Sequence, residues 1–301
     1  MNFNIIDTLA TYRRLISAPD AAMREAIFRS ELVAPFAGVV NVFGGGDGLA
    51  AFAQWGMAPD QFASEQGAHW ATILDTLAEH GAWQRAAQAL ERGRAAFESY
   101  AERVPLDTIT FALVLADLSH MPLQRGYSGF GGIPGWIMTI YGEPDAYNLE
   151  RVEGATVHEL HHNVRFRLFP FNPIHTTVGE YMVAEGLAES FTAELYGADK
   201  VGYYVTDFDE DRFEETRARI GGALDQTGFN EVRGYIFGDA IAGHRGLPQA
   251  GVPAFAGYAL GYKVVQEYLK RTGATVADAT FVPASEIIAA SRFFADRTSS
   301  R

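Results

Sequence analysis

The sequence predicts a mainly helical α+β fold in which a small sheet borders the helix that carries residues 158 to 162. Three observations support this prediction. Apolar residues recur at helical spacing through most of the first 105 residues. Two short runs rich in β-forming residues follow, at positions 108 to 116 and 136 to 141. Segments with helical character then occupy much of the chain after residue 150.

Residues 1 to 105 are predicted to form an N-terminal helical region. The apolar positions recur every three or four residues: Trp70, Ile73, Leu74 and Leu77, then, after a break at Gly81, Trp83, Ala86, Ala87 and Leu90. The glycine-rich run from residue 42 to 48 lacks the Gly-Lys-Ser/Thr ending of a phosphate-binding loop, so it predicts a turn. Residues 106 to 301 form the second region, and the two regions can build one compact unit.

The run from Trp136 to Tyr141 leads into the helix that follows, and two readings of it stay open. It is either the edge strand of the small sheet or an ordinary buried strand. Gly131 and Gly132 precede it, and glycines allow another backbone to approach closely in either case.

Residues 158 to 162 read His-Glu-Leu-His-His and match the pattern H-E-x-x-H. On a helix, His158 and His162 lie on the same face and can bind one metal ion. Glu159 then lies beside the ion, where a carboxylate can take a proton from a water molecule activated by zinc. With 8 His in 301 residues, chance would produce this pentamer about 0.015 times. His161 is expected either beside the site or facing solvent.

A catalytic zinc site usually has a third protein ligand. One class of zinc peptidases would place His at position 168, but Leu168 stands there, which excludes that class. Glu185 and Glu189 lie four residues apart on a downstream helical segment. Glu185 is the expected third ligand. Glu189 is expected to accept a hydrogen bond from the far ring nitrogen of a zinc-binding His. Glu180 faces another direction and ranks below Glu185 as a ligand.

Three segments together resemble a known family. They are V-H-E-L-H-H-N-V-R around the histidines, A-E-G-L-A-E from residue 184, and A-G-Y-A-L-G-Y-K-V-V-Q-E-Y-L from residue 256. They resemble a bacterial family of predicted zinc-dependent proteases of the gluzincin type, over roughly residues 105 to 295. A-E-G-L-A-E also resembles the N-E-G-F-A segment that carries the third zinc ligand of gluzincin aminopeptidases. The resemblance implies a zincin-like metallopeptidase fold, with one zinc ion on His158, His162 and Glu185 and with Glu159 as the base.

Other residues are candidates for binding substrate or its developing charge. Tyr258 and Tyr262 stand four apart, so a helix there presents both phenols on one face, and one of them can hydrogen-bond the oxyanion. Burial in the core is the alternative for both. His244 is a further candidate for this role. If residues 136 to 141 form an edge strand, an extended peptide can pair with it, and Gly132 and Trp136 are the expected contacts.

Composition limits the partners and the compartment. Zero Cys excludes disulfides, thiolate zinc ligands and a cysteine nucleophile. The formal net charge of −13 repels nucleic acid and anionic membrane surfaces, so neither is an expected partner. The first residues do not resemble a signal peptide, and no apolar run is long enough to span a bilayer, which favours the cytoplasm.

The sequence therefore predicts a zinc-dependent peptidase that hydrolyses peptide bonds with activated water. Two alternatives stay open: a zinc hydrolase of a non-peptide amide or ester, and a non-catalytic, zinc-stabilised peptide-binding protein. They differ in what Glu159 does, because only a hydrolase needs a base there.

Overall fold

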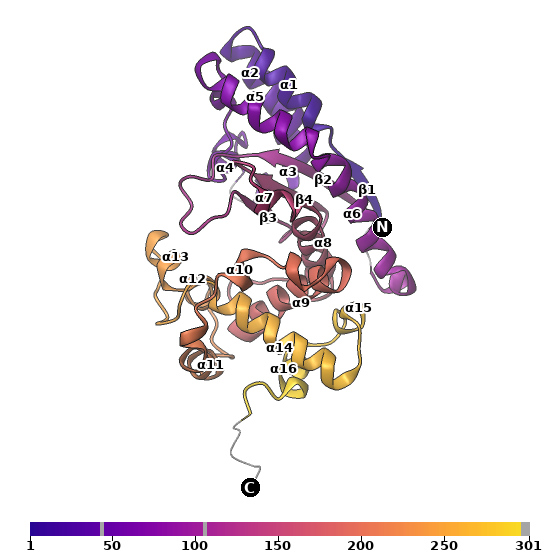
Figure 1. Cartoon of the computed structure of the whole chain (residues 1–301), viewed down its shortest axis with the longest axis vertical. Helices are drawn as coiled ribbons and strands as arrows, with labels where there is room; N and C mark the ends of the chain where they lie inside the picture. The colour runs from indigo at the N-terminus through magenta and orange to yellow at the C-terminus, as the bar shows by residue number, and fades with distance from the viewer. Residues whose placement is uncertain (43–44, 105–106, 296–301) are drawn as a thin grey trace. The chain divides into compact units, whose positions relative to one another are not determined.

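The computed structural model describes residues 1–42, 45–104 and 107–295, apart from the side chains of residues 64 and 65. Its contacts divide the chain into two units, residues 1–163 and 164–301. The division falls inside the helix α8 (Val152–Leu168) and does not coincide with the predicted boundary at residue 105. The predicted class, a mainly helical α+β fold with a small sheet, is confirmed (Figure 1).

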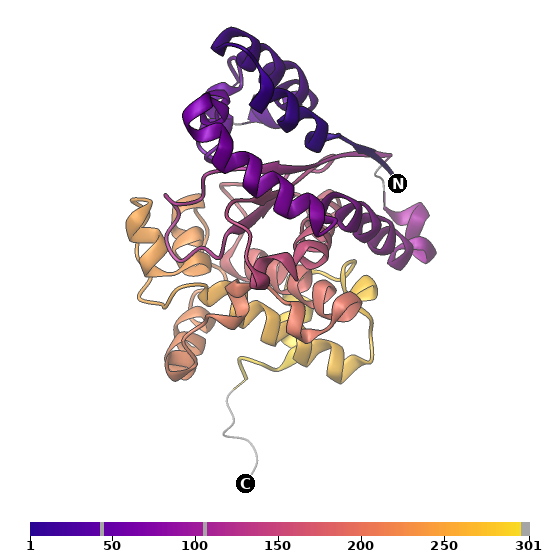
Figure 2. The same cartoon turned by 45° about the horizontal axis from the view of Figure 1, so that its top comes forward.

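The sheet belongs to the first unit (Figure 1 and Figure 2). Its strand order is β1-β2-β4-β3. The strands are β1 (Asn2–Ile5), β2 (Thr108–Leu115), β3 (Tyr127–Phe130) and β4 (Trp136–Tyr141). β1, β2 and β4 are parallel, whereas β3 runs antiparallel to β4, with Tyr127 opposite Tyr141. Most residues of β2 and β4 are buried, as is usual for parallel strands covered on both faces.

This order corrects two expectations about strands. Residues 136 to 141 form the internal strand β4, so the buried-strand reading is right and the edge-strand reading is wrong. The edge beside β4 is β3, which lies in the glycine-containing segment before it. The N-terminal region is also not helical throughout, because β1 pairs with β2 in a parallel register from Asn2 and Thr108 onward.

Helices fill the rest of the first unit. The α-helices are α1 (Thr8–Ser17), α2 (Ala21–Phe28), α3 (Ala37–Val42), α4 (Leu49–Ala53), α5 (Ser64–Glu79), α6 (Ala82–Ala96) and α7 (Ala146–Leu149). Short π or 3-10 turns are η1 (Arg29–Val33), η2 (Ala34–Phe36), η3 (Pro59–Phe62) and η4 (Glu98–Arg103). The predicted helical spacing around residues 70 to 90 is confirmed, since Ile73 and Leu77 of α5 and Leu90 of α6 are buried. In the predicted turn at residues 42 to 48, residues 43 and 44 lie outside the described part, and Gly45, Gly46 and Gly48 have positive φ.

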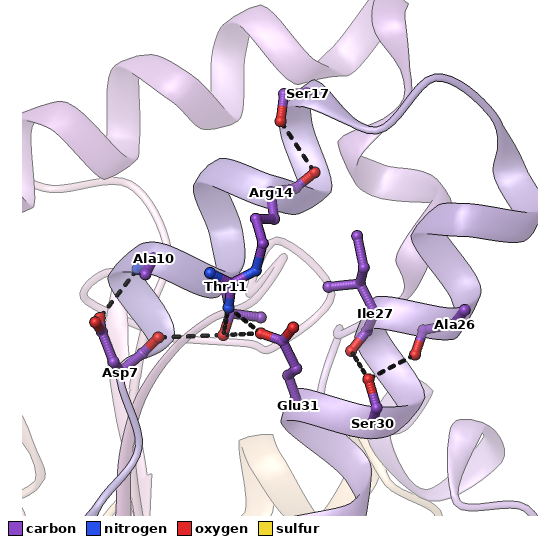
Figure 3. A network of polar contacts seen from close by, with 9 residues as sticks. All are labelled: Asp7, Ala10, Thr11, Arg14, Ser17, Ala26, Ile27, Ser30 and Glu31. Carbon is purple, nitrogen blue, oxygen red and sulfur yellow. Dashed lines mark hydrogen bonds and ion pairs between the residues drawn. The ribbon is translucent and has the colours of Figure 1, made fainter.

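A polar network ties α1 to η1 (Figure 3). The side chain of Asp7 caps α1 by accepting a hydrogen bond from the Ala10 amide at 3.0 Å. Thr11 Oγ1 lies 2.7 Å from Glu31 Oε2, and Arg14 forms an ion pair with the same carboxylate. Although burial raises the pKa of Glu31, the hydrogen bonds from Arg14 and Thr11 outweigh it, so the net shift is downward. The network therefore holds a charged carboxylate between the two segments.

The regular elements described in the second unit are all helices, joined by turns and loops. Its α-helices are α9 (Val178–Tyr196), α10 (Tyr203–Thr206), α11 (Phe213–Gly221), α12 (Phe229–Phe237), α13 (Asp239–His244), α14 (Ala256–Thr272), α15 (Val276–Ala279) and α16 (Ala284–Ser291), with 3-10 turns η5 (Ala198–Lys200) and η6 (Glu210–Arg212). α9 is buried along most of its length and packs against α14. Among the helices described, none is both long and apolar enough to cross a membrane.

The α9–α14 contact depends on glycines. A Cβ atom at Gly186 would collide with the backbone of Gly261, and one at Gly261 would collide with the Met182 carbonyl. The glycines of α14 thus form a surface for close packing against α9. It brings the backbone of α14 directly against the part of α9 that carries Glu185.

Candidate metal centre

Helix α8 is held against the sheet by polar side chains that are themselves buried. Asn163 is fully buried, and its Nδ2 donates hydrogen bonds to the carbonyls of Gly131 at 2.8 Å and Trp136 at 3.0 Å. Its Oδ1 accepts from the amide of Gly135 at 2.7 Å. One side chain therefore fixes the helix to both sides of the turn that joins β3 to β4, which sets the position of the residues one turn earlier.

The two histidines of the H-E-x-x-H pattern lie on one face of α8. The ring centroids of His158 and His162 are 4.7 Å apart and the rings are nearly perpendicular. Their exposed fractions are 8% and 5%, so neither is a surface residue. This arrangement follows from the helical spacing of four residues and agrees with the predicted ligand pair.

Glu159 lies against β3. A Cβ atom at Gly129 would collide with the Glu159 carboxylate, and one at Gly131 would collide with the Glu159 backbone. The strand therefore passes so close to α8 that a side chain at Gly131 would meet backbone, and one at Gly129 would displace the Glu159 side chain. Glu159 is 8% exposed, and the strand restricts where its carboxylate can move.

The expected third ligand comes from α9, whose start is fixed by a capping box. Thr177 Oγ1 accepts from the Glu180 amide at 3.1 Å, while Glu180 Oε2 accepts from the Thr177 amide at 2.8 Å. Glu180 is thus committed to the helix end. Glu185 is 3% exposed. One ligand atom from each of His158, His162 and Glu185 lies within 4.8 Å of the others.

This group has the composition of a zinc site. Two imidazole nitrogens and one carboxylate oxygen form one of the ligand sets of catalytic zinc, which leaves a coordination position for water. All three side chains are buried, and a buried carboxylate is costly without a compensating positive charge. The residues therefore fit a zinc ion, and His158, His162 and Glu185 are the residues that would hold it.

Glu189 lies one turn beyond Glu185 on α9 and is 2% exposed. Its Oε2 accepts a hydrogen bond from the Gly202 amide at 2.7 Å. A Cβ atom at position 202 would lie 2.6 Å from Oε1, so Gly202 is required for this approach. The segment before α10 thereby fixes the carboxylate of Glu189.

The two candidate tyrosines of α14 have different surroundings. Tyr258 is 8% exposed and stacks on Tyr204 with centroids 4.8 Å apart, inside an aromatic cluster that includes Phe237. Tyr262 is half-buried, and burial, together with the nearby negative charge of Glu189, raises the pKa of its phenol. The phenol of Tyr262 therefore stays protonated and able to donate at neutral pH.

The remaining residues that the sequence analysis considered for the site each lie in different surroundings. His244 is exposed at the end of α13. Trp136 donates from Nε1 to the Pro35 carbonyl at 3.1 Å and packs on Gly38. Gly132 has room for a side chain, since a Cβ atom there would meet only Phe130 at 3.7 Å. His161 is fully buried with its ring 6.3 Å from that of Phe97, so the solvent-facing alternative is excluded.

Two residues near the site were not predicted. Gly129 makes room for Glu159, and Asn163 fixes α8 to the β3–β4 turn. A weak signal for the second was present, since Asn directly follows the last histidine and Asn in a helix interior competes for backbone hydrogen bonds. Nothing in the sequence distinguished Gly129 from its neighbouring glycines.

Comparison with known proteins assigns the chain to a family. The model of a family described as predicted Zn-dependent protease (DUF2268) matches residues 82–289. The chain is also 37% identical over 297 residues to the uncharacterized protein YjfC of Bacillus subtilis (strain 168), covering 96% of this chain and 97% of that protein. No solved structure matches significantly. The protein belongs to the family of predicted Zn-dependent proteases, as the three motifs indicated.

Proposed function

We propose that the protein is a zinc-dependent peptidase of the gluzincin type. The observation that carries the proposal is the buried group of His158, His162 and Glu185, in which three ligand atoms lie within 4.8 Å of one another. A zinc ion held there would act as a Lewis acid towards water and towards the substrate carbonyl. The match to the family of predicted Zn-dependent proteases supports the same activity.

In this proposal Glu159 moves the proton. Its carboxylate accepts a proton from the attacking water and then donates it to the nitrogen of the departing amine. Support comes from its place beside His158 and from Gly129, which leaves the carboxylate just enough room. Glu189 is proposed to orient a zinc-binding histidine through the far ring nitrogen, while Gly202 holds one of its oxygens.

The substrate is proposed to be an extended peptide that pairs with the outer edge of β3. β3 has one neighbour, β4, among the strands described, so its other edge can accept main-chain hydrogen bonds. This replaces the expectation that residues 136 to 141 form the binding edge, and it gives the backbone near Gly132 a role in place of the Trp136 side chain. The net charge of −13 favours neutral or basic peptides.

Tyr262 is proposed as the donor to the oxyanion, ahead of Tyr258 and His244. It is half-buried rather than enclosed in the aromatic stack, and its phenol is protonated at neutral pH. The aromatic stack around Tyr258 supports a packing role for that residue. A phenol that points at developing negative charge stabilises the transition state more than the bound substrate.

The direct test of the activity is a digest of an unbiased peptide library, analysed by mass spectrometry. The protein should cut peptides, lose this activity with a zinc chelator, and regain it when zinc is restored. A parallel assay with small amides and esters tests the first alternative, a zinc hydrolase that acts on non-peptide bonds. Turnover of these without any peptide cleavage would favour a non-peptide hydrolase, and no turnover of either would favour a non-catalytic zinc-stabilised protein.

A further inference from the structure

The second unit contains a cavity of about 830 Å³ that the proposed activity does not use. It is bounded by the end of α8, the start of α9, the turn at residues 221 to 226 and one side of α16. Its apolar lining includes Phe166, Phe169, Phe171, Leu224 and Ile288. The lining also includes polar and charged side chains, among them Thr176, Gln226 and Ser285. Its size lies in the range of small-molecule sites, which combine apolar walls with placed polar groups.

One strong positive charge lies in this lining. Arg165 is 3% exposed, and its guanidinium lies over the ring of Phe169, with Cζ 3.8 Å from the centroid. Nη1 donates to the carbonyls of Thr280 at 2.7 Å and Val282 at 2.8 Å. Burial lowers the pKa of Arg165 to about 10, because the charged form loses hydration there.

No carboxylate within the described part of the chain forms an ion pair with Arg165. Glu180 is the acid whose charge reaches it, but that carboxylate is exposed and accepts a hydrogen bond from the Thr177 amide. Asp225 also lines the cavity and is exposed. Solvent screens both rim acids, whereas a buried guanidinium is screened much less. Arg165 is therefore the buried charge of the lining, whereas both acids are exposed to solvent.

We propose that this cavity binds a small carboxylic acid with an apolar body. Its carboxylate would pair with the guanidinium of Arg165, and its hydrocarbon part would fill the space among the phenylalanines. A carboxylate supplies the planar acceptor that guanidinium binds best, and it would offset the buried charge. This site is separate from the proposed peptidase chemistry and does not depend on it.

The alternative is that Arg165 only braces the turn at residues 280 to 282. Two kinds of variant separate the readings. Arg165→Met removes the charge but also the hydrogen bonds to that turn. Ala289→Trp adds a large side chain at an exposed residue that lines the cavity, and it leaves Arg165 in place. Ala290→Trp is the matched control, because Ala290 is also exposed on α16 but does not line the cavity.

The test is calorimetric titration of the full zinc-containing chain with 4-phenylbutyrate and octanoate, and with 4-phenylbutanol and octanol. The acids should bind saturably at one site, and the alcohols should bind at least tenfold more weakly. Arg165→Met should lower the binding affinity for the acids by roughly tenfold to a hundredfold, the usual loss for a hydrogen bond to a charged group. Ala289→Trp should abolish binding and Ala290→Trp should preserve it.

A carboxylate can also bind zinc, so the comparison between the tryptophan variants decides the question. Equal binding by Ala289→Trp and Ala290→Trp would overturn the proposal, as would acids that bind no better than their alcohols. If Arg165→Met does not fold, the two tryptophan variants and the acid–alcohol comparison still give the answer.

Discussion

The burial of ionisable side chains on α8 and α9 is the feature at the residue scale that most needs a physical cause. His158, His162 and Glu185 are each less than a tenth exposed. Removing such groups from water is unfavourable unless a partner charge compensates them. A divalent cation bound there would compensate all three at once.

We expect the purified protein to contain about one zinc ion per chain, because three ligands make a complete site for catalytic zinc. Elemental analysis should show loss of zinc in His158→Ala, His162→Ala and Glu185→Gln. His175→Ala and Glu180→Gln are the controls, since both residues are exposed and outside the group, and they should retain zinc. Full zinc in Glu185→Gln would assign the third ligand elsewhere, with Glu189 next to test.

A second expectation concerns the strand beside the base. Gly129→Ala should lower kcat and leave zinc bound, because the added methyl group collides with the Glu159 carboxylate and not with a ligand. Gly132→Ala is the control, since a methyl group there makes only an ordinary contact with Phe130. Equal activity of the two variants would show that β3 does not position Glu159.

The tyrosines give a third comparison. Tyr262→Phe should lower kcat by about 10²-fold with zinc content and melting temperature unchanged, the loss typical of an oxyanion donor. Tyr258→Phe should keep kcat, because its ring packs on Tyr204 and that contact survives. The opposite result would exchange the two roles, and normal turnover in both would leave His244 as the candidate.

Local chemistry explains which residues of the site could be predicted. His158, Glu159 and His162 are related by helical spacing alone, so the motif fixed their geometry in advance. Gly129 and Asn163 depend on how β3 and its turn meet α8, a contact between segments some 30 positions apart in the chain. No local pattern encodes that contact, and the same holds for the pairing of Glu189 with Gly202.

At the scale of elements, the close contact of α9 with α14 positions the third ligand. Glu185 directly precedes Gly186, whose missing side chain lets the backbone of Gly261 approach. Packing the α14 backbone against α9 restricts both shift and rotation of α9. The glycine pair thereby connects the packing of the second unit to the orientation of Glu185.

Gly261→Ala should therefore lower stability by about 1–3 kcal/mol, the usual cost of overpacking, and the melting temperature by roughly 3–10 °C. Zinc affinity should fall with it, because α9 must shift to admit the methyl group. Gly222→Ala is a suitable control, since a methyl group there meets only ordinary contacts. Calorimetry that shows the same melting temperature for both variants would contradict this account of the helix contact.

The helices and strands also show which elements can be predicted from the sequence pattern alone. Long periodic helices such as α5, α6 and α14 were predictable because their apolar positions repeat. β1 and β3 have four residues each, and their polar residues and glycine give no clear alternation. The edge position of β3 depends on hydrogen bonds to β4, which are not local, so the edge was assigned to the wrong strand.

For the whole molecule, the family match covers only part of the chain, and the sheet joins that part to residues that precede it. The family model begins at residue 82, yet β1 lies far before it and pairs with β2 inside the matched region. The similarity to YjfC spans nearly the full length of both chains. The part of the chain before residue 82 therefore contributes β1 to the sheet that borders α8, although the family model does not cover it.

Glu159 is the proposed general base, so its substitution separates a catalyst from a zinc-stabilised scaffold. Turnover by the parent and by Glu159→Gln should be measured on a peptide from the library digest, with zinc content matched by elemental analysis. The variant keeps the shape of the side chain and removes its basicity, so zinc should stay and kcat should fall by about 10²- to 10⁴-fold. A variant that retains full zinc and cuts as fast as the parent would show that Glu159 is not the base and would contradict the proposed mechanism.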